Sequence, residues 1–189
     1  MKLKSLIFFT ALVLIFAGCN RDAGNTPLQE KGKSQNKVLQ LLQQVDSFED
    51  SKGFNIDVAK EFIDKSVEFA QTYPEDPMSA ELLYKAGLTA MTVAKNAENK
   101  EETEFYSHKA LTIFDDILKI YPEFSETINC ILNKGVIYDD ILHDYMNAEI
   151  YYREFIAKSP SDSIAINLES YLFYLGKSPD EIMSEVVKK

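Results

Sequence analysis

The sequence predicts an all-α protein whose helices form antiparallel pairs along an array. Apolar residues recur at helical spacing from residue 37 onward, and no run alternates polar and apolar residues with a period of two. Three of the expected helices end alike, with an apolar residue five positions before a proline. With seven Gly and six Pro among 189 residues, the chain also has too few turn-forming residues for a turn-dense all-β fold.

Residues 1–18 (MKLKSLIFFTALVLIFAG) have the layout of a secretory signal peptide. Lys2 and Lys4 give a positive start. The apolar run that follows is about a dozen residues long, shorter than the ~20 residues that span a bilayer. Two small residues then come directly before Cys19. The sequence therefore predicts cleavage at this point, with an uncleaved signal anchor as the alternative.

The four residues 16–19 (FAGC) resemble the lipobox of bacterial lipoproteins, although Phe16 stands where Leu is commoner. The resemblance implies cleavage before Cys19 and attachment of diacylglycerol to its sulfur, which would anchor the chain stably to a membrane. Asn20 follows, and in the sorting rule of enteric bacteria it is Asp at this position that retains a lipoprotein at the inner membrane. We therefore expect a lipid-anchored envelope protein, in the outer rather than the inner membrane. Its face, periplasmic or cell-surface, stays open.

The segment after the cysteine predicts a flexible tether over residues 19–36. Residues 21–36 are polar, contain two Gly and one Pro, and show no apolar period. A flexible stretch of this length spans roughly 20–25 Å. We expect the folded helical domain to cover residues 37–189, held just clear of the lipid headgroups.

The helices of this domain follow from their apolar positions. Helix ends are predicted at Pro74, Pro122 and Pro160, and Gly176 ends the seventh helix. The last helix begins with the capping box 178–181 (SPDE). The apolar positions of the first seven helices fall within residues 38–45, 58–70, 82–93, 105–118, 128–141, 148–156 and 164–175.

Helix ends at regular spacing indicate a repeat. The sequences 69–74, 117–122 and 155–160 share the pattern of an apolar residue, four intervening positions and a proline. The prolines are 48 and 38 residues apart, a spacing typical of helical arrays.

The chain resembles the tetratricopeptide repeat family (TPR) over residues 54 to about 175. The family pattern has small residues where helices touch, an aromatic residue between units and a closing proline. One unit matches this pattern with 11 extra residues near 95–105, and the next matches it with one extra residue in the turn 143–145. The matching residues are Gly87, Ala110, Phe114, Ile117 and Pro122, then Gly135, Tyr138, Ala148, Tyr152, Phe155 and Pro160. The resemblance implies an α-solenoid of about three antiparallel helix pairs.

The resemblance also implies which residues face the groove of such an array. They come from the first helix of each of two pairs: Tyr84, Leu88, Met91, Asn129, Leu132, Val136, Asp139 and Asp140. An apolar groove with an acidic rim suits a partner segment with apolar anchors and some Lys or Arg. The alternative, held equally, is that these residues pack against the next helix of so short an array.

No catalytic or metal-binding constellation is found in the sequence. His108 and His143 lack a second ligand at helical spacing, and Cys130 lies between apolar residues as a small buried hydrophobe would. The adjacent acids Asp139 and Asp140 point about 100° apart on a helix, so they cannot share a proton. We therefore expect no enzyme activity, no cofactor and no metal.

Charge and layout lead to the expected function. A formal net charge of −10 argues against binding to nucleic acid, which requires clustered Lys and Arg. We expect an interaction module or scaffold that holds another envelope protein. The order of lipobox, tether and short helical array is similar to that of TPR lipoproteins in outer-membrane β-barrel assembly. This resemblance implies a role in the assembly of outer-membrane proteins. The alternative is an accessory lipoprotein of an envelope uptake system that recognises a small ligand or glycan, with Tyr145, Tyr151 and Tyr152 as stacking candidates.

Overall fold

A computed structural model describes residues 26–48 and 55–187, and they fold as helices without any strand, which confirms the predicted all-α class. The helices in chain order are α1 (Pro27–Phe48), α2 (Ile56–Thr72), α3 (Ser79–Lys95), α4 (Lys100–Ile120), α5 (Thr127–Val136), the π-helical turn η1 (Ile137–Ile141), α6 (Tyr145–Lys158), α7 (Ser163–Tyr171) and α8 (Pro179–Val187).

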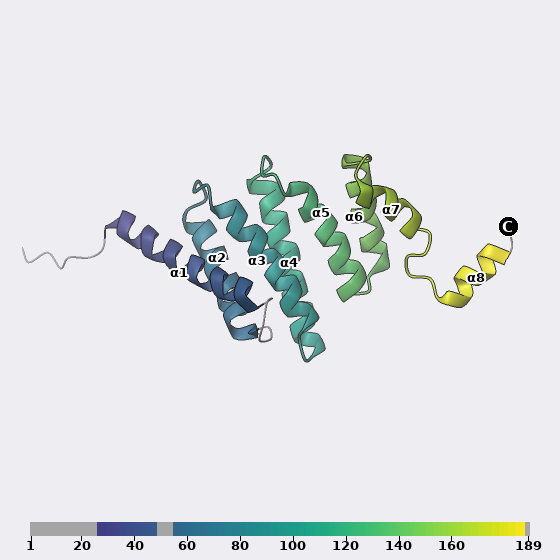
Figure 1. The fold of residues 1–189 in the computed structure, drawn as a ribbon, viewed down its shortest axis with the longest axis horizontal. Helices are drawn as coiled ribbons and strands as arrows, with labels where there is room; N and C mark the ends of the chain where they lie inside the picture. The colour runs from purple at the N-terminus through teal and green to yellow at the C-terminus, as the bar shows by residue number, and fades with distance from the viewer. Residues whose placement is uncertain (1–25, 49–54, 188–189) are drawn as a thin grey trace, which may run out of the picture.

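The helices lie side by side along one long axis (Figure 1). Each helix from α1 to α6 packs against the next one in the chain, and η1 also contacts α3, α4 and α6. In Figure 1, α8 extends beyond α7 at the C-terminal end, and α1 lies at the opposite end. Packing is therefore mostly between neighbours in sequence, as in a quasi-one-dimensional array.

The first helix begins at Pro27, so it takes up residues 27–36 of the expected tether. Thr26 and Gln29 form a reciprocal capping box: the Thr26 amide donates to Gln29 Oε1 at 2.9 Å, and the Gln29 amide donates to Thr26 Oγ1 at 3.3 Å. Pro27 occupies the first helical position, which needs no amide donor. The helix therefore starts ten residues before the expected boundary at residue 37. Apolar periodicity does not reveal this start, because the first turns of α1 are polar.

The three helices with the same sequence ending also end with the same backbone geometry. The amides of Tyr73, Tyr121 and Ser159 donate to the carbonyl four residues earlier, at 2.8–2.9 Å. Those carbonyls belong to the apolar residues of the shared pattern: Phe69, Ile117 and Phe155. All three side chains are fully buried, so each helix end is fixed by the core as well as by the proline that follows.

Two glycines allow aromatic rings to lie directly on a helix backbone. A Cβ atom on Gly87 would lie 2.6 Å from the ring of Phe114, and one on Gly135 would lie 2.6 Å from the ring of Tyr152. Both rings are buried. The close approaches that the sequence predicted for α3 with α4 and for α5 with α6 are therefore present.

The π-helical turn η1 changes the direction of the side chains at the end of α5. A π turn holds one residue more than an α turn, and such turns recur at functional sites. Here Asp139 is turned inward and is 6% exposed, whereas Asp140 is exposed. The chain then reverses through His143, whose φ of 53° is in the left-handed region. The sequence analysis placed one extra residue in the turn 143–145. The structure has an extra residue a little earlier, within the π-helical turn η1.

Candidate functional site

The groove candidates of α3 pack largely against the core. Tyr84 and Leu88 are partly buried against it, and the Tyr84 ring lies 6.0 Å from the ring of Phe124, centroid to centroid. Burial raises the pKa of the Tyr84 phenol. Met91 is only 9% exposed and belongs to the core cluster, so it cannot line an open groove.

The candidates of α5 are also held within the protein. Asn129 donates to Glu126 Oε2 at 2.6 Å, and Leu132 and Val136 pack against the buried core. Asp139 and Asp140 follow on η1, where Asp139 points into the protein and Asp140 is exposed. Of the eight groove candidates, Met91 and Asp139 are buried, Asp140 is exposed, and the other five are partly exposed, so both alternatives remain open for those five.

Asp139 joins three helical elements. Its Oδ2 atom accepts hydrogen bonds from the Tyr152 hydroxyl of α6 at 3.0 Å and from the Tyr171 hydroxyl of α7 at 2.7 Å. Burial, together with this carboxylate, raises the pKa of Tyr171 to about 12 and raises the pKa of Tyr152 further. Asp140 instead pairs with Lys95 of α3 at 3.2 Å. The sequence singled out both acids, but only the fold assigns one of them to the interior.

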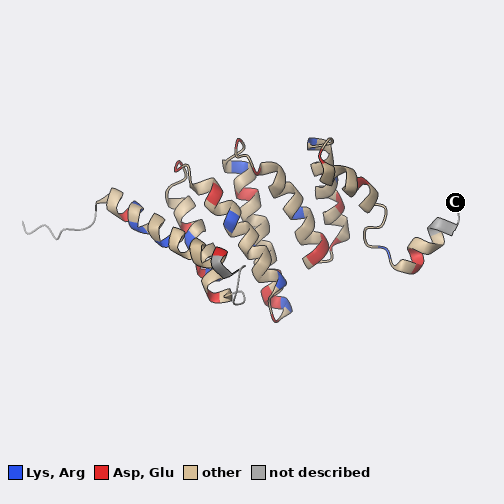
Figure 2. Ribbon diagram, in the orientation of Figure 1, with Lys and Arg blue, Asp and Glu red and all other residues tan. Residues whose placement is uncertain are grey.

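A cavity of about 530 Å³ opens beside Asp139, and we call it the tyrosine hollow. Three tyrosines form much of its wall, and the remaining lining residues come from η1, the turn after it and the segment before α8. The lining residues are Asp139, Asp140, His143, Tyr145, Tyr171, Tyr174, Gly176, Lys177 and Ser178. The three tyrosines are each 40–44% exposed. Figure 2 shows acidic residues where the helix formed by α5 and η1 ends. Sequence analysis missed this site because Tyr171 and Tyr174 are distant from Tyr145 in the chain and follow no recognisable spacing.

The tyrosines proposed for sugar stacking do not form one surface. Tyr152 is 3% exposed, and Tyr151 stacks on Tyr138 with ring centroids 5.5 Å apart. The Lys134 ammonium lies 4.2 Å from the Tyr151 ring centroid. Of the three candidates only Tyr145 is exposed, so the sequence expectation for Tyr151 and Tyr152 is corrected.

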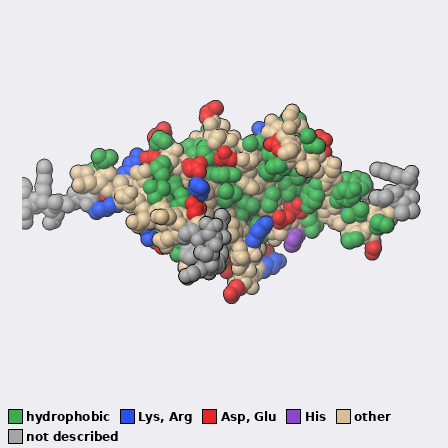
Figure 3. All heavy atoms as spheres, viewed as in Figure 1, with side chains coloured by type: hydrophobic (Ala, Val, Ile, Leu, Met, Phe, Trp, Pro, Cys, Tyr) green, Lys and Arg blue, Asp and Glu red, His purple; other side chains and the backbone are tan. Residues whose placement is uncertain are grey.

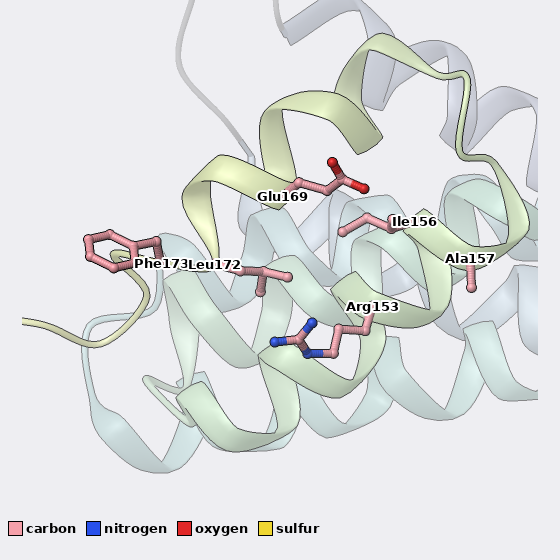
Figure 4. Close-up of a pocket in the computed structure, with 6 residues that line it drawn as sticks. All are labelled: Arg153, Ile156, Ala157, Glu169, Leu172 and Phe173. Carbon is pink, nitrogen blue, oxygen red and sulfur yellow. The ribbon is translucent and has the colours of Figure 1, made fainter.

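A second cavity, of about 510 Å³, lies between α6 and the end of α7 (Figure 4). In Figure 4, Ile156 and Leu172 lie between Arg153 and Glu169. Exposed apolar residues continue the same stripes at helical spacing: Met146 and Ile150 precede Arg153 on α6, and Ile166 precedes Glu169 on α7.

We call Met146, Ile150, Ile166 and Phe173 the C-terminal apolar surface. They are 80%, 59%, 58% and 37% exposed, respectively. Figure 3 shows hydrophobic side chains gathered over the C-terminal half of the molecule on the face in view.

The remaining candidates supply no reactive centre. Cys130 is fully buried, and burial raises the pKa of its thiol to about 12. His143 Nδ1 lies 3.0 Å from the Asp139 carbonyl oxygen. Within residues 26–48 and 55–187, no group of three or more His, Cys, Asp or Glu side chains could hold a metal ion. None of the helices described combines the length and apolar character needed to cross a bilayer. Cys19 lies outside the described residues.

No protein-family model matches the sequence, and no curated protein or solved structure is significantly similar to it. The exposed surfaces of the chain are therefore the guide to its function.

Proposed function

We propose that this chain is a membrane-anchored protein-interaction module of the bacterial envelope, built as a short TPR-like array. The observation that supports it best is the C-terminal apolar surface. Terminal units of a helical array normally turn a polar face to water. Here α6 and α7, the last two helices that pack against each other along the array, expose Met146, Ile150 and Ile166. Such a surface is typical of a protein-binding site.

The arrangement of the two ends supports the same function. The expected lipid on Cys19 precedes α1, whereas the apolar surface belongs to α6 and α7 at the other end of the array (Figure 1). A lipid at one end and a binding surface at the other would hold a partner away from the headgroups. In this proposal the chain acts as a scaffold in the outer membrane, with assembly of outer-membrane proteins as one setting.

The TPR-like architecture within this proposal is supported by three geometric features. Helices pack in sequence order, three alternate helices end in the same geometry, and two aromatic rings lie on glycines. By this interpretation α1 with α2, α3 with α4 and α5 with α6 form three pairs, and α7 covers the last pair.

The anchor is tested by a Cys19→Ala variant. Fractionation of cells should move the protein from the membrane to the soluble fraction, because lipid attachment requires the thiol. A Cys130→Ala variant is the matched control and should stay with the membrane. A Cys19→Ala protein that still sediments with lipid would contradict the anchor.

The binding surface is tested by site-specific photo-cross-linking in intact cells. A photoreactive residue at Ile150 should form an adduct with a specific envelope protein, and Ile166→Glu should abolish the adduct. The control position is Gln71, which is exposed on α2 at a distance from the surface. Equal adducts from both positions would contradict a specific surface.

The alternative function is a ligand- or glycan-recognising accessory lipoprotein. The tyrosine hollow favours it, since exposed tyrosine rings stack on sugars. Binding of the purified chain to an immobilised glycan, without any protein adduct from Ile150, would support this alternative.

A further inference from the structure

The tyrosine hollow presents hydrogen-bond acceptors on Asp139 and Tyr171. The Tyr171 hydroxyl gives its single hydrogen to Asp139 Oδ2, so its oxygen can only accept from a ligand. Tyr152 also donates to Oδ2, so the two phenol hydroxyls meet at one oxygen of this carboxylate. Asp139 therefore contributes a largely buried carboxylate to the wall of the hollow.

His143 also lines the hollow. Its Nδ1 atom lies 3.0 Å from the carbonyl oxygen of Asp139, and a carbonyl can only accept, so Nδ1 carries the hydrogen. A sugar hydroxyl both donates and accepts, whereas a guanidinium has five N–H donors and no acceptor. The acceptors on Asp139 and Tyr171 match a group that only donates, such as a guanidinium.

The aromatic walls suit the same group. Tyr145 packs on the backbone of Gly176, where a Cβ atom would lie 2.8 Å from the ring and φ is +73°. Tyr171 and Tyr174 leave 40% and 44% of their surface open. Planar guanidinium groups stack on such rings more readily than an ammonium does.

Lys95 beside the hollow and Lys177 in its wall both have partners. Lys95 pairs with Asp140, and the Lys177 ammonium lies 4.1 Å from the ring centroid of Phe173. Asp139 is therefore the carboxylate that can attract a cation from a ligand. The net charge of −10 adds a long-range attraction for basic partners.

The hollow and the C-terminal apolar surface touch at one pair of aromatic residues. The rings of Tyr174 and Phe173 meet edge to face with centroids 5.1 Å apart. Tyr145 of the hollow is also adjacent in sequence to Met146 of the surface. One partner could therefore place a charged residue in the hollow and apolar residues beside it.

We propose that the tyrosine hollow binds an arginine side chain of the protein partner, with Asp139 holding the guanidinium and Tyr145, Tyr171 and Tyr174 surrounding it. This inference rests on the proposed interaction function and names the chemistry of the partner. Arginine, tyrosine and tryptophan are the residue types that most often dominate the binding energy of a protein interface.

Saturation-transfer NMR on the full chain in detergent tests the hollow directly. The probes are N-acetyl-arginine methylamide and its citrulline analogue, which has a similar shape but no charge. We expect saturation transfer to the arginine probe and little to citrulline. Tyr174→Ala should weaken binding about two- to fivefold through the lost ring, and Asp139→Asn should weaken it about tenfold.

Phe105→Ala is the matched control, because it removes an exposed ring on α4 outside the hollow, and it should leave binding unchanged. Circular dichroism checks that each variant is folded. If Asp139→Asn does not fold, the effect of Tyr174→Ala on binding of the arginine probe is the test. Equal transfer to both probes, binding of an oligosaccharide instead, or binding unaffected by Tyr174→Ala would overturn the proposal. The Ile150 adduct is measured separately, so a failure of the hollow is distinguishable from a failure of the interaction function.

Discussion

The buried carboxylate of Asp139 accepts a hydrogen bond from the hydroxyl of Tyr152 at 3.0 Å, and the ring of the same tyrosine covers Gly135. One side chain of α6 thus makes a polar contact with η1 and a close apolar contact with α5. Tyr171 donates to the same carboxylate oxygen, so η1, α6 and α7 are joined at a single atom. The polar end of this cluster faces the tyrosine hollow.

Tyr152→Phe should destabilise the protein by about 1–3 kcal/mol, since it removes a donor from a buried carboxylate. The ring remains over Gly135, so packing is preserved and the loss reports the hydrogen bond. Chemical denaturation followed by circular dichroism measures it. Tyr174→Phe is the control, because that exposed ring has no comparable buried partner, and it should change stability by less than about 0.5 kcal/mol. Equal effects of the two substitutions would contradict the role of the hydroxyl.

Stability should fall as the pH rises above about 10. The pKa of Tyr171 is raised from 10.0 to about 12, and that of Tyr152 is raised as well, by burial and by Asp139. The neutral phenols therefore favour the folded state below pH 10, and this contribution is lost as the pH approaches 12. Denaturation midpoints from pH 8 to 12 measure the decline. A Tyr152→Phe, Tyr171→Phe double variant should show a shallower decline, and an unchanged slope would contradict the assignment.

Gly135→Ala should destabilise the protein by about 1–3 kcal/mol through overpacking. The added Cβ would lie 2.6 Å from two atoms of the Tyr152 ring, so the ring or the helix must move. Gly32→Ala is the matched control on α1, where no atom lies within 4 Å of the new Cβ, and it should stabilise by about 0.5–1 kcal/mol. Thermal unfolding of both variants measures the difference. A neutral result at Gly135 would argue against close packing of α5 and α6.

Ser66→Ala and Ser107→Ala should be neutral or stabilising by about 1 kcal/mol each. Both hydroxyls are buried, on α2 and α4, and neither has a hydrogen-bond partner among the described residues. Removing an unsatisfied polar group relieves a desolvation cost. Ser79 is equally buried, but its Oγ donates to the Tyr73 carbonyl at 2.7 Å, so Ser79→Ala should destabilise by about 1 kcal/mol. Denaturation curves of the three variants should therefore differ in sign, and a loss at Ser66 or Ser107 would reveal a partner for that hydroxyl.

The helix pattern could be predicted from sequence because it depends on local rules. Apolar spacing located α2 to α6, and the prolines at 74, 122 and 160 fixed the ends of three helices. The capping box at 178–181 correctly marked the start of α8. The start of α1 also had a local signal, in Thr26 and Gln29, but it was hidden within a polar stretch.

The sequence by itself determined the helical class, the regular helix ends and the glycines that lie under aromatic rings, because each depends on residues close in the chain or on a fixed period. Only the tertiary structure decided that Asp139 faces inward while Asp140 faces water, since a single π turn sets that rotation. It alone brought Tyr145, Tyr171 and Tyr174 together at one hollow. The physical reason is that helix formation follows local hydrogen bonding, whereas a binding surface depends on how separate helices pack.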